Sequence, residues 1–455
     1  MSPFDRYRQM LSQVQPVSVT GQVVSVRGLT VAVGDFPAPV GAGCRIMRGP
    51  SGLDARVIGF SGELTLVMPL GSTMGICRGD RVEGAEGQPT VPVGDQMLGR
   101  VVDGMARPID GLSDLEPEMH MPLWPEPISP MLRRRISQPL VTGVRAIDSM
   151  LTVGRGQRMG IFSPSGAGKS VLMGMISRYC DADAIVIALI GERGREVRDF
   201  VEKELGSEGL KRAVVVASTS DQPPLVRVQA GAVATCIAEY FRDSGKNVVL
   251  VMDSLTRLAT AQRQIGLVAG EPPTAGGYTP SVFGLIPELL ERVGRTDAGS
   301  ITGFYSVLSD GPETAGPISD AVRSVADGHV VLSVEKANRG EFPAIDFLES
   351  ISRVMGEVTG ERHIEAAASI RRVAALYREI EDMVNIGAYR KGNSQQFDMA
   401  VEAMPLVREF VAQSAFDRPE LQLSETIEAL IGLCRTIGCY CDPAETGEPR
   451  MAAQR

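Results

Sequence analysis

A short segment rich in serine and glycine, residues 163–170, has the composition of a phosphate-binding loop. It reads SPSGAGKS and stands between an apolar stretch, residues 159–162, and a stripe of helical spacing that begins at Val171. Backbone N–H groups in such a loop point at phosphate oxygens, and the N-terminus of the following helix favours the same negative charge. Lys169 would reach the terminal phosphates, and the Ser170 hydroxyl would hold Mg²⁺. The sequence therefore predicts a site for a nucleoside triphosphate and its metal ion.

The loop departs from the usual pattern at its first position, where Ser163 stands in place of glycine. An ordinary connection from a strand to a helix is the alternative explanation of a glycine-rich turn. The residues that we expect to contact the nucleotide here are Ser163, Pro164, Ser165, Gly166, Ala167, Gly168, Lys169, Ser170 and Val171.

Two acidic residues follow apolar stretches further along the chain. Asp253 ends NVVLVMD, and Glu192 comes directly after AIVIALI. An aspartate at the end of a strand would supply the second hold on Mg²⁺, although it can equally cap the next helix, here SLTRLATAQ. Glu192 would orient and polarise the attacking water if its strand neighbours the strand of the phosphate loop. Its alternative role is that of an acid favoured by the dipole of a helix N-terminus.

The residues from 140 to 355 alternate between apolar strands and stretches of helix length. The predicted strands read GIF, AIVIALI, AVVVAST, NVVLVMD, SITGFYSVL and HVVLSV. This alternation is typical of a parallel sheet wrapped by helices, in which ligands bind beyond the carboxyl ends of the strands. The phosphate loop, Glu192 and Asp253 all fall at such ends, so we expect one α/β nucleotide-binding domain.

Four further regions flank this domain. Short alternating strands over residues 17–93 predict a small β-barrel. Residues 94–139 hold five prolines within fourteen positions and predict an extended connector. Residues 356–455 have helical periodicity and predict a helical domain. Residues 1–16 predict a short helix, either docked on the protein or in contact with a partner or a membrane surface.

Composition narrows the class of protein. The chain has 455 residues, a net charge of −9 and no apolar run long enough to cross a membrane. The N-terminus lacks a secretory pattern, so we expect a cytoplasmic protein. An acidic total argues against a nucleic-acid backbone as partner. Seven scattered cysteines suit a reducing compartment, and the cluster Cys434, Cys439 and Cys441 lacks the spacing of a structural metal site.

Longer segments carry a resemblance to a known family. They read GIFSPSGAGKSVLMGM, IALIGERGREVRDFVE, LVMDSLTRLATAQRQIGLVAGEPPTAGGYTPSVF and FPAIDFLESISRVM. The chain resembles the rotary-type ATPases, and among them the flagellum-specific export ATPases, relatives of the type III secretion ATPases and of the catalytic subunit of ATP synthase. The resemblance spans about residues 20 to 430 and implies a RecA-like P-loop core, ATP and Mg²⁺, and a ring of six identical subunits.

The resemblance also implies roles for particular residues. Glu192 would activate water and Arg193 would contact the nucleotide. Arg353, of the S-R-V motif, would be the arginine finger that a neighbouring subunit inserts at the phosphates. The alternative is that its side chain only forms a salt bridge on the surface. Phe342 takes the place of the aromatic residue that stacks on adenine, and Phe416 matches a second aromatic residue that could equally belong to the core.

The resemblance implies partners as well: the flagellar export apparatus, a stator-like regulator, a central stalk, export substrates and their chaperones, met at the inner face of the cytoplasmic membrane. The loop NIGAYRKGN, residues 385–393, favours the flagellar and secretion branch over ATP synthase. An injectisome ATPase, a non-catalytic ring subunit and a ring helicase remain alternatives. A helicase would need aromatic and basic residues in its barrel, and residues 17–93 hold only Phe36 and Phe60. The roles of proton flow and of residues 434–455 stay open.

Overall fold

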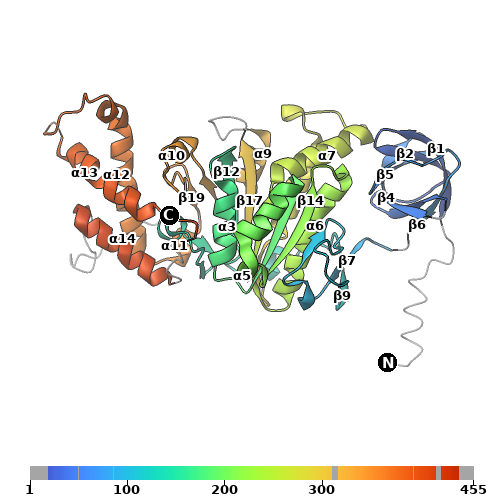
Figure 1. Cartoon of the computed structure of the whole chain (residues 1–455), viewed down its shortest axis with the longest axis horizontal. Helices are drawn as coiled ribbons and strands as arrows, with labels where there is room; N and C mark the ends of the chain where they lie inside the picture. Colours follow the sequence, from blue (N-terminus) through green and yellow to red (C-terminus); the bar gives the residue numbers. More distant parts are fainter. Residues whose placement is uncertain are drawn as a thin grey trace.

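The computed structural model describes residues 19–49, 51–85, 87–309, 316–392, 394–416 and 422–439. Figure 1 shows three parts in a row: a β-barrel, a central sheet covered by helices, and a set of C-terminal helices. This arrangement confirms the predicted fold class. The helix predicted for residues 1–16 lies outside the described residues, as do residues 440–455.

The barrel is closed and contains a small core of its own. Its strands pair in the order β1-β2-β5-β4-β3-β6. The six strands are β1 Thr20–Arg27, β2 Thr30–Gly34, β3 Gly43–Arg48, β4 Ser51–Ser61, β5 Leu64–Pro69 and β6 Arg81–Gly84. Alternate residues point inward, among them Val31, Ile46 and Val82, which are fully buried. The next strand, β7 Thr90–Val93, pairs with β9 Met119–Pro122 outside the barrel.

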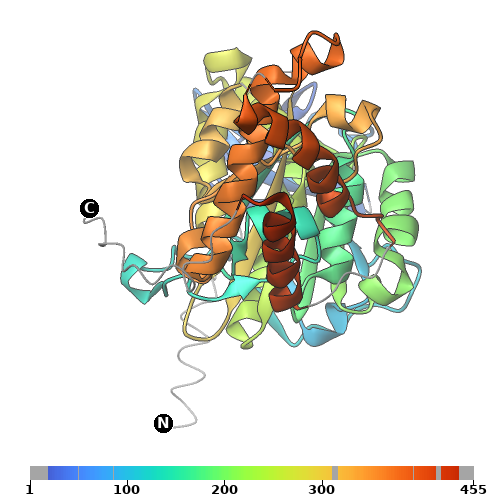
Figure 2. The ribbon, with the colours of Figure 1, turned by 90° about the vertical axis from the view of Figure 1, so that its left-hand side faces the viewer.

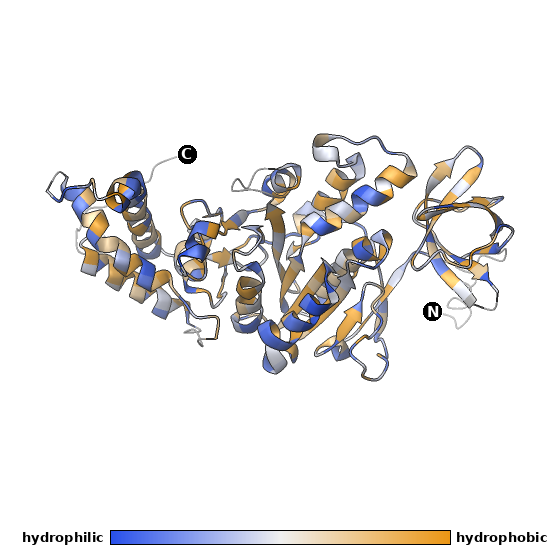
Figure 3. Ribbon diagram, turned by 45° about the horizontal axis from the view of Figure 1, so that its top comes forward, coloured by the Kyte–Doolittle hydropathy of each residue, from blue (hydrophilic) through white to orange (hydrophobic). Residues whose placement is uncertain are grey.

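The central sheet has the order β19-β18-β12-β17-β15-β13-β14-β8, with β16 paired to β17. Its strands are β8 Val101–Asp103, β12 Arg158–Pro164, β13 Ala184–Glu192, β14 Ala213–Thr219, β15 Asn247–Asp253, β16 Gly294–Arg295, β17 Ser300–Ser309, β18 Gly328–Val331 and β19 Ile351–Ser352. All pairings are parallel except those of β16 and β19. Each residue of β13 is buried, because helices cover both faces of a parallel sheet. The strands are accordingly the apolar centre of this part in Figure 3.

The predicted connector, residues 94–139, is partly built into the core. Strand β8 pairs with β14 and forms one edge of the central sheet, and β9 pairs with β7. Strand β8 could not be predicted from the sequence, because it is only three residues long and lies between Gly99 and Gly104. This segment is therefore structural as well as connecting.

Helices cover the two faces of the sheet and bury a separate apolar cluster on each. Helices α6, α7, α8 and α9 supply one cluster, and α2 and α3 supply the other. The helices of this part are α2 Arg145–Met150, α3 Lys169–Tyr179, α4 Gly194–Asp199, α5 Gly206–Leu210, α6 Pro224–Asp243, α7 Leu255–Ala269, α8 Pro280–Glu291, α9 Pro317–Val325, α10 Val334–Asn338 and α11 Met355–Val358. Shorter elements are η1 Asp95–Met97, η2 Pro130–Leu132, β10 Pro139–Leu140, β11 Val153–Gly154, the π-helix η3 Phe200–Leu205 and η4 Ala275–Gly277.

Three helices follow in the described part of the chain: α12 Glu361–Asn385, α13 Gln395–Val411 and α14 Leu423–Ile437. Figure 2 shows them in front of the central part when the molecule is viewed from its C-terminal side. Their buried residues, such as Ile370, Val407 and Leu430, belong to the same apolar cluster as α2 and α3. Within the described residues, no helix is long and apolar enough to cross a membrane.

Candidate active site

The predicted phosphate loop joins β12 to α3, and its backbone shape explains its sequence. Gly166 and Gly168 have φ angles of 85° and 86°, a region that residues with a side chain rarely adopt. Ser163 does not share this conformation, because it still belongs to β12 and pairs with Leu308 of β17. Its hydroxyl donates to the carbonyl of Pro164 at 2.8 Å. Serine in place of the usual first glycine is thus compatible with the loop.

Lys169 and Asp253 form a buried ion pair at the end of this loop. The Nζ of Lys169 is 2.5 Å from Oδ1 of Asp253, and the Ser306 hydroxyl donates to the same oxygen at 2.6 Å. Ser170 is the next residue of α3 and is exposed. The structure thus brings the loop, Lys169 and Asp253 together at the carboxyl edge of the sheet, and it adds Ser306, which the sequence did not single out.

Glu192 lies at the same edge, although the condition attached to its prediction does not hold. Strand β13 is not a neighbour of β12, since β17 and β15 lie between them. It is instead the neighbour of β15, where Leu189 pairs with Asp253. This register places Glu192 within electrostatic reach of Asp253 and Lys169. The carboxylate thus reaches the phosphate loop through β15 and its aspartate.

The surroundings of Glu192 favour its protonated form. Burial raises the pKa of this carboxyl to about 8, helped by a hydrogen bond with Glu196 and by the negative charge of Asp253. The positive charges of Arg257 and Lys169 act in the opposite direction. Arg257 is the direct partner, with its Nη1 2.7 Å from Oε2 of Glu192. A carboxylate with a raised pKa at this edge is suited to accept and return a proton.

Three residues of this cluster were not predicted from the sequence: Arg257, Ser306 and Glu196. Arg257 stands in the first turn of α7, where the Ser254 side chain caps the helix by accepting from its backbone N–H. Ser306 is a polar residue within the apolar strand SITGFYSVL, and that exception was the signal available. Arg257 and Glu196 had no comparable signal, because their partners come from other elements.

A cavity of about 320 Å³ opens beside the phosphate loop. Its lining is mostly apolar and combines Gly168, Val171, Leu172 and Met175 of the loop and α3 with Leu332, Phe342, Pro343, Ala344, Gln413, Ser414 and Ala415. The Phe342 ring is half exposed, and a Cβ built on Gly168 would lie 3.7 Å from its Cε1 atom. An aromatic wall next to a phosphate loop has the size and chemistry to hold a nucleotide base.

Phe416 is close to this cavity but does not line it. Its ring is exposed, and the guanidinium carbon of Arg178 is 5.1 Å from the ring centroid. Its neighbour Ala415 does line the cavity, and the Ala415 carbonyl accepts hydrogen bonds from Arg178 and Tyr179 of α3. The segment that carries Phe416 is therefore fixed to the helix of the phosphate loop.

Gln413, another residue that was not predicted, fastens this wall of the cavity. Its backbone N–H donates to the carbonyl of Phe342 at 2.9 Å. Its side chain accepts from the backbone N–H of Arg145 and donates to the carbonyl of Gly143, both at 2.9 Å. Gln413 is buried and comes two residues after α13 ends, so it connects the C-terminal helices to the base cavity and to α2.

The two predicted arginines lie apart from this cluster. The Arg193 side chain is 80% exposed, and its nearest acidic partner is Glu196 at 3.6 Å. Arg353 is exposed and follows β19, where its backbone N–H donates to the carbonyl of Asp327. Asp327 precedes β18, whose first residue pairs with Met159 near the amino end of β12. Arg353 is thus at the opposite end of β12 from its own phosphate loop, roughly 15 Å away along the strand.

Three family models match successive parts of the chain. The beta-barrel domain of the ATP synthase alpha/beta family matches residues 17–85, and the nucleotide-binding domain of that family matches residues 143–352. The T3SS EscN ATPase C-terminal domain matches residues 359–431.

Individual relatives are similar over almost their whole length. A Flagellum-specific ATP synthase of Bacillus subtilis (strain 168) is 49% identical over 418 residues, which cover 91% of this chain and 94% of the relative. A Type 3 secretion system ATPase of Xanthomonas euvesicatoria is 47% identical over 395 residues, covering 86% and 89%. The assembled ATPase EscN of the enteropathogenic E. coli type III secretion system, solved in complex with its central stalk EscO, matches with a TM-score of 0.83 at 42% identity, covering 91% of this chain and 99% of that one.

Proposed function

The chain belongs to the ATP synthase alpha/beta family, in its group of flagellar and type III secretion ATPases, and on this premise we propose that it hydrolyses Mg-ATP in a ring to drive flagellar protein export. The observation that carries the proposal is the convergence of Lys169, Asp253 and Glu192 at one edge of the sheet, next to the Phe342 cavity. A phosphate cradle, a metal-holding acid, a water-aligning acid and a base cavity are the parts that ATP hydrolysis requires.

The chemistry of the donor set fits Mg²⁺. This ion prefers oxygen ligands and uses one or two protein groups together with substrate phosphates. Ser170 offers an exposed hydroxyl, and Asp253 offers a carboxylate that already binds the cation of Lys169. When bound, Mg²⁺ would neutralise charge on the phosphates. Among the described residues, no group of three His, Cys, Asp or Glu side chains could hold a metal ion, so these two ligands rely on substrate for the remainder.

The roles of the side chains follow from their positions. Lys169 exchanges its partner Asp253 for phosphate oxygens when a nucleotide occupies the loop. Glu192 aligns water for in-line attack, and Arg257, at 2.7 Å, holds its carboxyl in place. Phe342 stacks on the adenine. Phe416 does not line the cavity, and its neighbour Ala415 forms the part of the wall that the α13–α14 segment supplies.

Completion of the site requires a second subunit. Arg353 is exposed at the end of the sheet opposite its own loop, so it is available to the site of a neighbouring copy. An arginine supplied in this way is worth roughly 10³–10⁵ in rate, and an isolated chain should be slow. Exposed Arg193 would contact the nucleotide near the same boundary. EscN has been solved in an assembled state, and we expect this chain to assemble into a ring of six identical subunits.

Sequence identity alone does not distinguish the flagellar export system from the injectisome. The Bacillus flagellar relative and the Xanthomonas secretion relative have nearly equal identities, 49% and 47%. We favour the flagellar system, with a stalk subunit like EscO, a stator-like regulator, chaperones and export substrates as partners at the inner face of the cytoplasmic membrane. Restoration of motility in a flagellar ATPase deletion strain, without restoration of secretion in an injectisome ATPase deletion strain, is the expected result. The reverse pattern would assign the chain to the injectisome.

Substitution of Glu192 tests the catalytic proposal directly. Glu192→Gln should bind ATP with nearly unchanged affinity and lose at least about 10²-fold in steady-state hydrolysis, because the amide cannot take up a proton. Glu202→Gln, an exposed acid on η3, is the matched control and should remain active. Appreciable turnover by the Glu192 variant would remove its assigned role.

A mixing experiment tests the shared site. Arg353→Ala and Lys169→Ala should each be inactive alone, since each lacks one half of every site. Rings that contain both variants include some interfaces with an intact loop on one side and an intact arginine on the other. Activity should therefore reappear in mixtures, and its absence at every ratio would contradict a site built from two subunits.

A further inference from the structure

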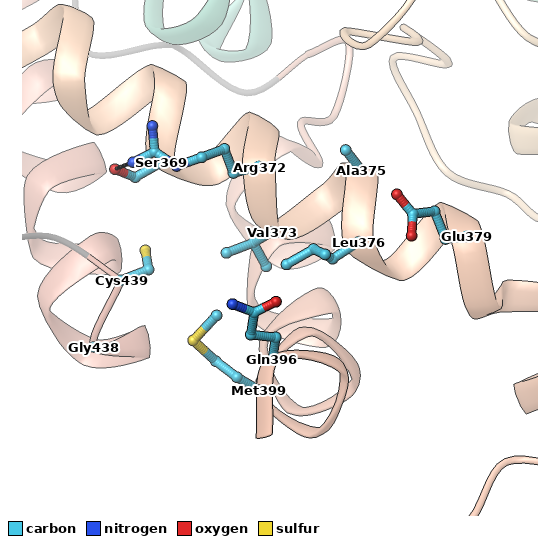
Figure 4. A pocket seen from close by; sticks show the side chains of 10 residues that line it. All are labelled: Ser369, Arg372, Val373, Ala375, Leu376, Glu379, Gln396, Met399, Gly438 and Cys439. Atoms are coloured by element: carbon cyan, nitrogen blue, oxygen red, sulfur yellow. Dashed lines mark hydrogen bonds between the residues drawn. The ribbon is translucent and has the colours of Figure 1, made fainter. Parts of the chain in front are cut away.

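The C-terminal helices enclose a second cavity that is separate from the nucleotide site. It has a volume of about 550 Å³ and lies between α12, α13 and the end of α14. Val373, Leu376 and Met399 give it apolar walls, and Arg372, Glu379 and Gln396 add polar groups. Figure 4 shows the Cys439 side chain at one end of this cavity, with its sulfur directed toward the helix that carries Ser369 and Arg372.

A buried cysteine lies next to the cysteine of the cavity. Cys434 is completely buried in the last turns of α14, whereas Cys439 is partly exposed and lines the cavity. The helix ends at Gly438, which has a φ of 72°, and the chain then turns back so that the N–H of Cys439 donates to the carbonyl of Cys434 at 3.1 Å. This return brings residues five positions apart side by side. The Cys439 thiol also donates to the carbonyl of Cys434 at 3.6 Å, so the cavity-lining cysteine lies directly against its buried neighbour.

The neighbours of this pair make the two thiols unequal. A hydrogen bond from Cys434 lowers the pKa of the Cys439 thiol to about 7, and the positive charge of Arg372 acts in the same direction against the effect of burial. The pKa of Cys434 is raised, first by its hydrogen bond to the Cys439 sulfur and then by burial. Cys439 is therefore the thiol that ionises more readily and faces the cavity, and Cys434 is the partner that keeps its proton.

We propose that Cys439 and Cys434 form a thiol–disulfide exchange site, at which a small organic disulfide enters the cavity and the two cysteines become joined by a reversible disulfide bond. The cavity gives such a molecule access to the Cys439 sulfur. Apolar walls and a nearby arginine suit the organic body and the partial negative charge of the sulfur that leaves.

The proposed exchange has two steps. The Cys439 thiolate attacks one sulfur of R–S–S–R, the S–S bond breaks, and R–S⁻ leaves and takes up a proton from water. Cys434 then loses its proton and attacks the Cys439 sulfur, which expels the second R–S⁻, and this thiolate takes up the released proton. Two cysteine thiols lose two electrons in total, and the small disulfide is reduced to two thiols. Once Cys439 is in the mixed disulfide, its negative charge is gone, and the main cause of the raised pKa of Cys434 is gone with it.

The bond would alter the attachment of α14 to α12. While both cysteines are protonated, the Cys434 thiol donates to the carbonyl of Ala366 in α12 at 3.5 Å and the Cys439 thiol donates to the carbonyl of Cys434 at 3.6 Å. Disulfide formation removes both donors. Backbone hydrogen exchange in the last turn of α14 should therefore change on oxidation and return after reduction. This effect is independent of ATP turnover, so its failure and a failure of the proposed function can be distinguished.

The test uses the full chain with Cys441→Ser, which removes the third cysteine of this region, and 2-hydroxyethyl disulfide as the probe. Peptide mapping by mass spectrometry at pH 7 should find residues 434 and 439 joined, with the loss of two hydrogen atoms and no retained hydroxyethylthio group. Dithiothreitol should reverse the change. Cys439→Ser should abolish it, and Cys434→Ser should stop the reaction at a mixed disulfide on Cys439.

Cys77, which is exposed on the barrel, is the control within the same molecule. A thiol with a pKa of about 7 should react at pH 7 about three times faster than an ordinary free cysteine, once its lower nucleophilicity is included. Modification of Cys77 while Cys439 stays free would overturn the proposal. A stable hydroxyethylthio adduct on Cys439 in the protein that retains Cys434 would overturn it as well.

Discussion

The barrel and the C-terminal helices flank the same sheet, yet they are attached to it in different ways. The barrel closes on a core of its own, and one hydrogen bond between it and the helices of the sheet runs from Arg56 to Gln229 of α6 at 3.2 Å. Met68 is a barrel residue that joins the apolar cluster of the sheet. The C-terminal helices share a continuous cluster with α2 and α3. The comparison teaches that the barrel is an appended unit, whereas the helices are an extension of the nucleotide-binding core.

A matched pair of core substitutions should give the largest effect on this comparison. Ile46 in the barrel and Ile370 in α12 are both fully buried, and truncation of either to alanine should cost about 2–5 kcal/mol. Ile370→Ala should lower the melting temperature of the helices and the sheet together and weaken ATP binding. Ile46→Ala should loosen the barrel alone. Hydrogen exchange measured along the chain at increasing temperature checks both, and equal loosening of the sheet by Ile46→Ala would break the comparison.

The titration of Glu192 should give a somewhat smaller change in stability and should sharpen the comparison between the barrel and the C-terminal helices. The folded-state pKa of this carboxyl is about 8 against an ordinary value of 4.5, so the folded protein keeps a proton that the unfolded chain has lost. Stability should fall as pH rises from about 5 to about 8, by about 2–4 kcal/mol, and then level off. The melting temperature of Glu192→Gln relative to the unchanged protein should therefore increase over this pH range.

The part of the molecule that loses stability as the pH rises provides a second check on the same prediction. Because the helices share the core of the sheet, their hydrogen exchange should follow the pH dependence of the sheet, while that of the barrel should not. A pH dependence confined to the barrel, or a constant difference in melting temperature between the two proteins, would contradict it.

Gln413 should give the smallest effect and the most local one. Gln413→Leu removes the side-chain bonds to Arg145 and Gly143 and leaves both backbone groups buried without that partner. The Phe342 wall should loosen, and KM for ATP should rise about tenfold, or about 1.4 kcal/mol, with a smaller change in kcat. Gln395→Leu, an exposed glutamine at the start of α13, is the control and should leave KM unchanged. Equal KM values for the two variants would show that the helices do not position the base cavity.

Much of the architecture could be predicted from the sequence, because it follows from local patterns. Alternation predicted the barrel, and the long apolar strands predicted the parallel sheet and placed Asp253 and Glu192 at one edge. The order of the strands could not be predicted in this way, so the separation of β12 from β13 appeared only in the structure. Strand β8 escaped prediction because three residues are too few to show a period.

In the candidate site, too, residues within a local motif could be predicted and residues that depend on distant partners could not. Residues within a motif, such as Lys169 and Ser170, could be located from their spacing alone. Arg257 and Gln413 could not, since their partners lie far away in the chain, and neither the type nor the spacing of these two residues identifies those partners. Ser163 shows the converse: the motif suggested a defect in the loop, and the backbone shows that this position needs no glycine.

The long helix α12 has a mechanical consequence. Its 25 residues make a rod about 37 Å long. His363 near its start contacts the Ser149 carbonyl, and Glu381 near its end pairs with Arg339 at the end of α10 and Arg408 of α13. A rod fastened at both ends passes a displacement of one end on to the other. By thermodynamic reciprocity, if occupation of the Phe342 cavity shifts α13 through Gln413, then a load applied to the far end of α12 must change the affinity of that cavity.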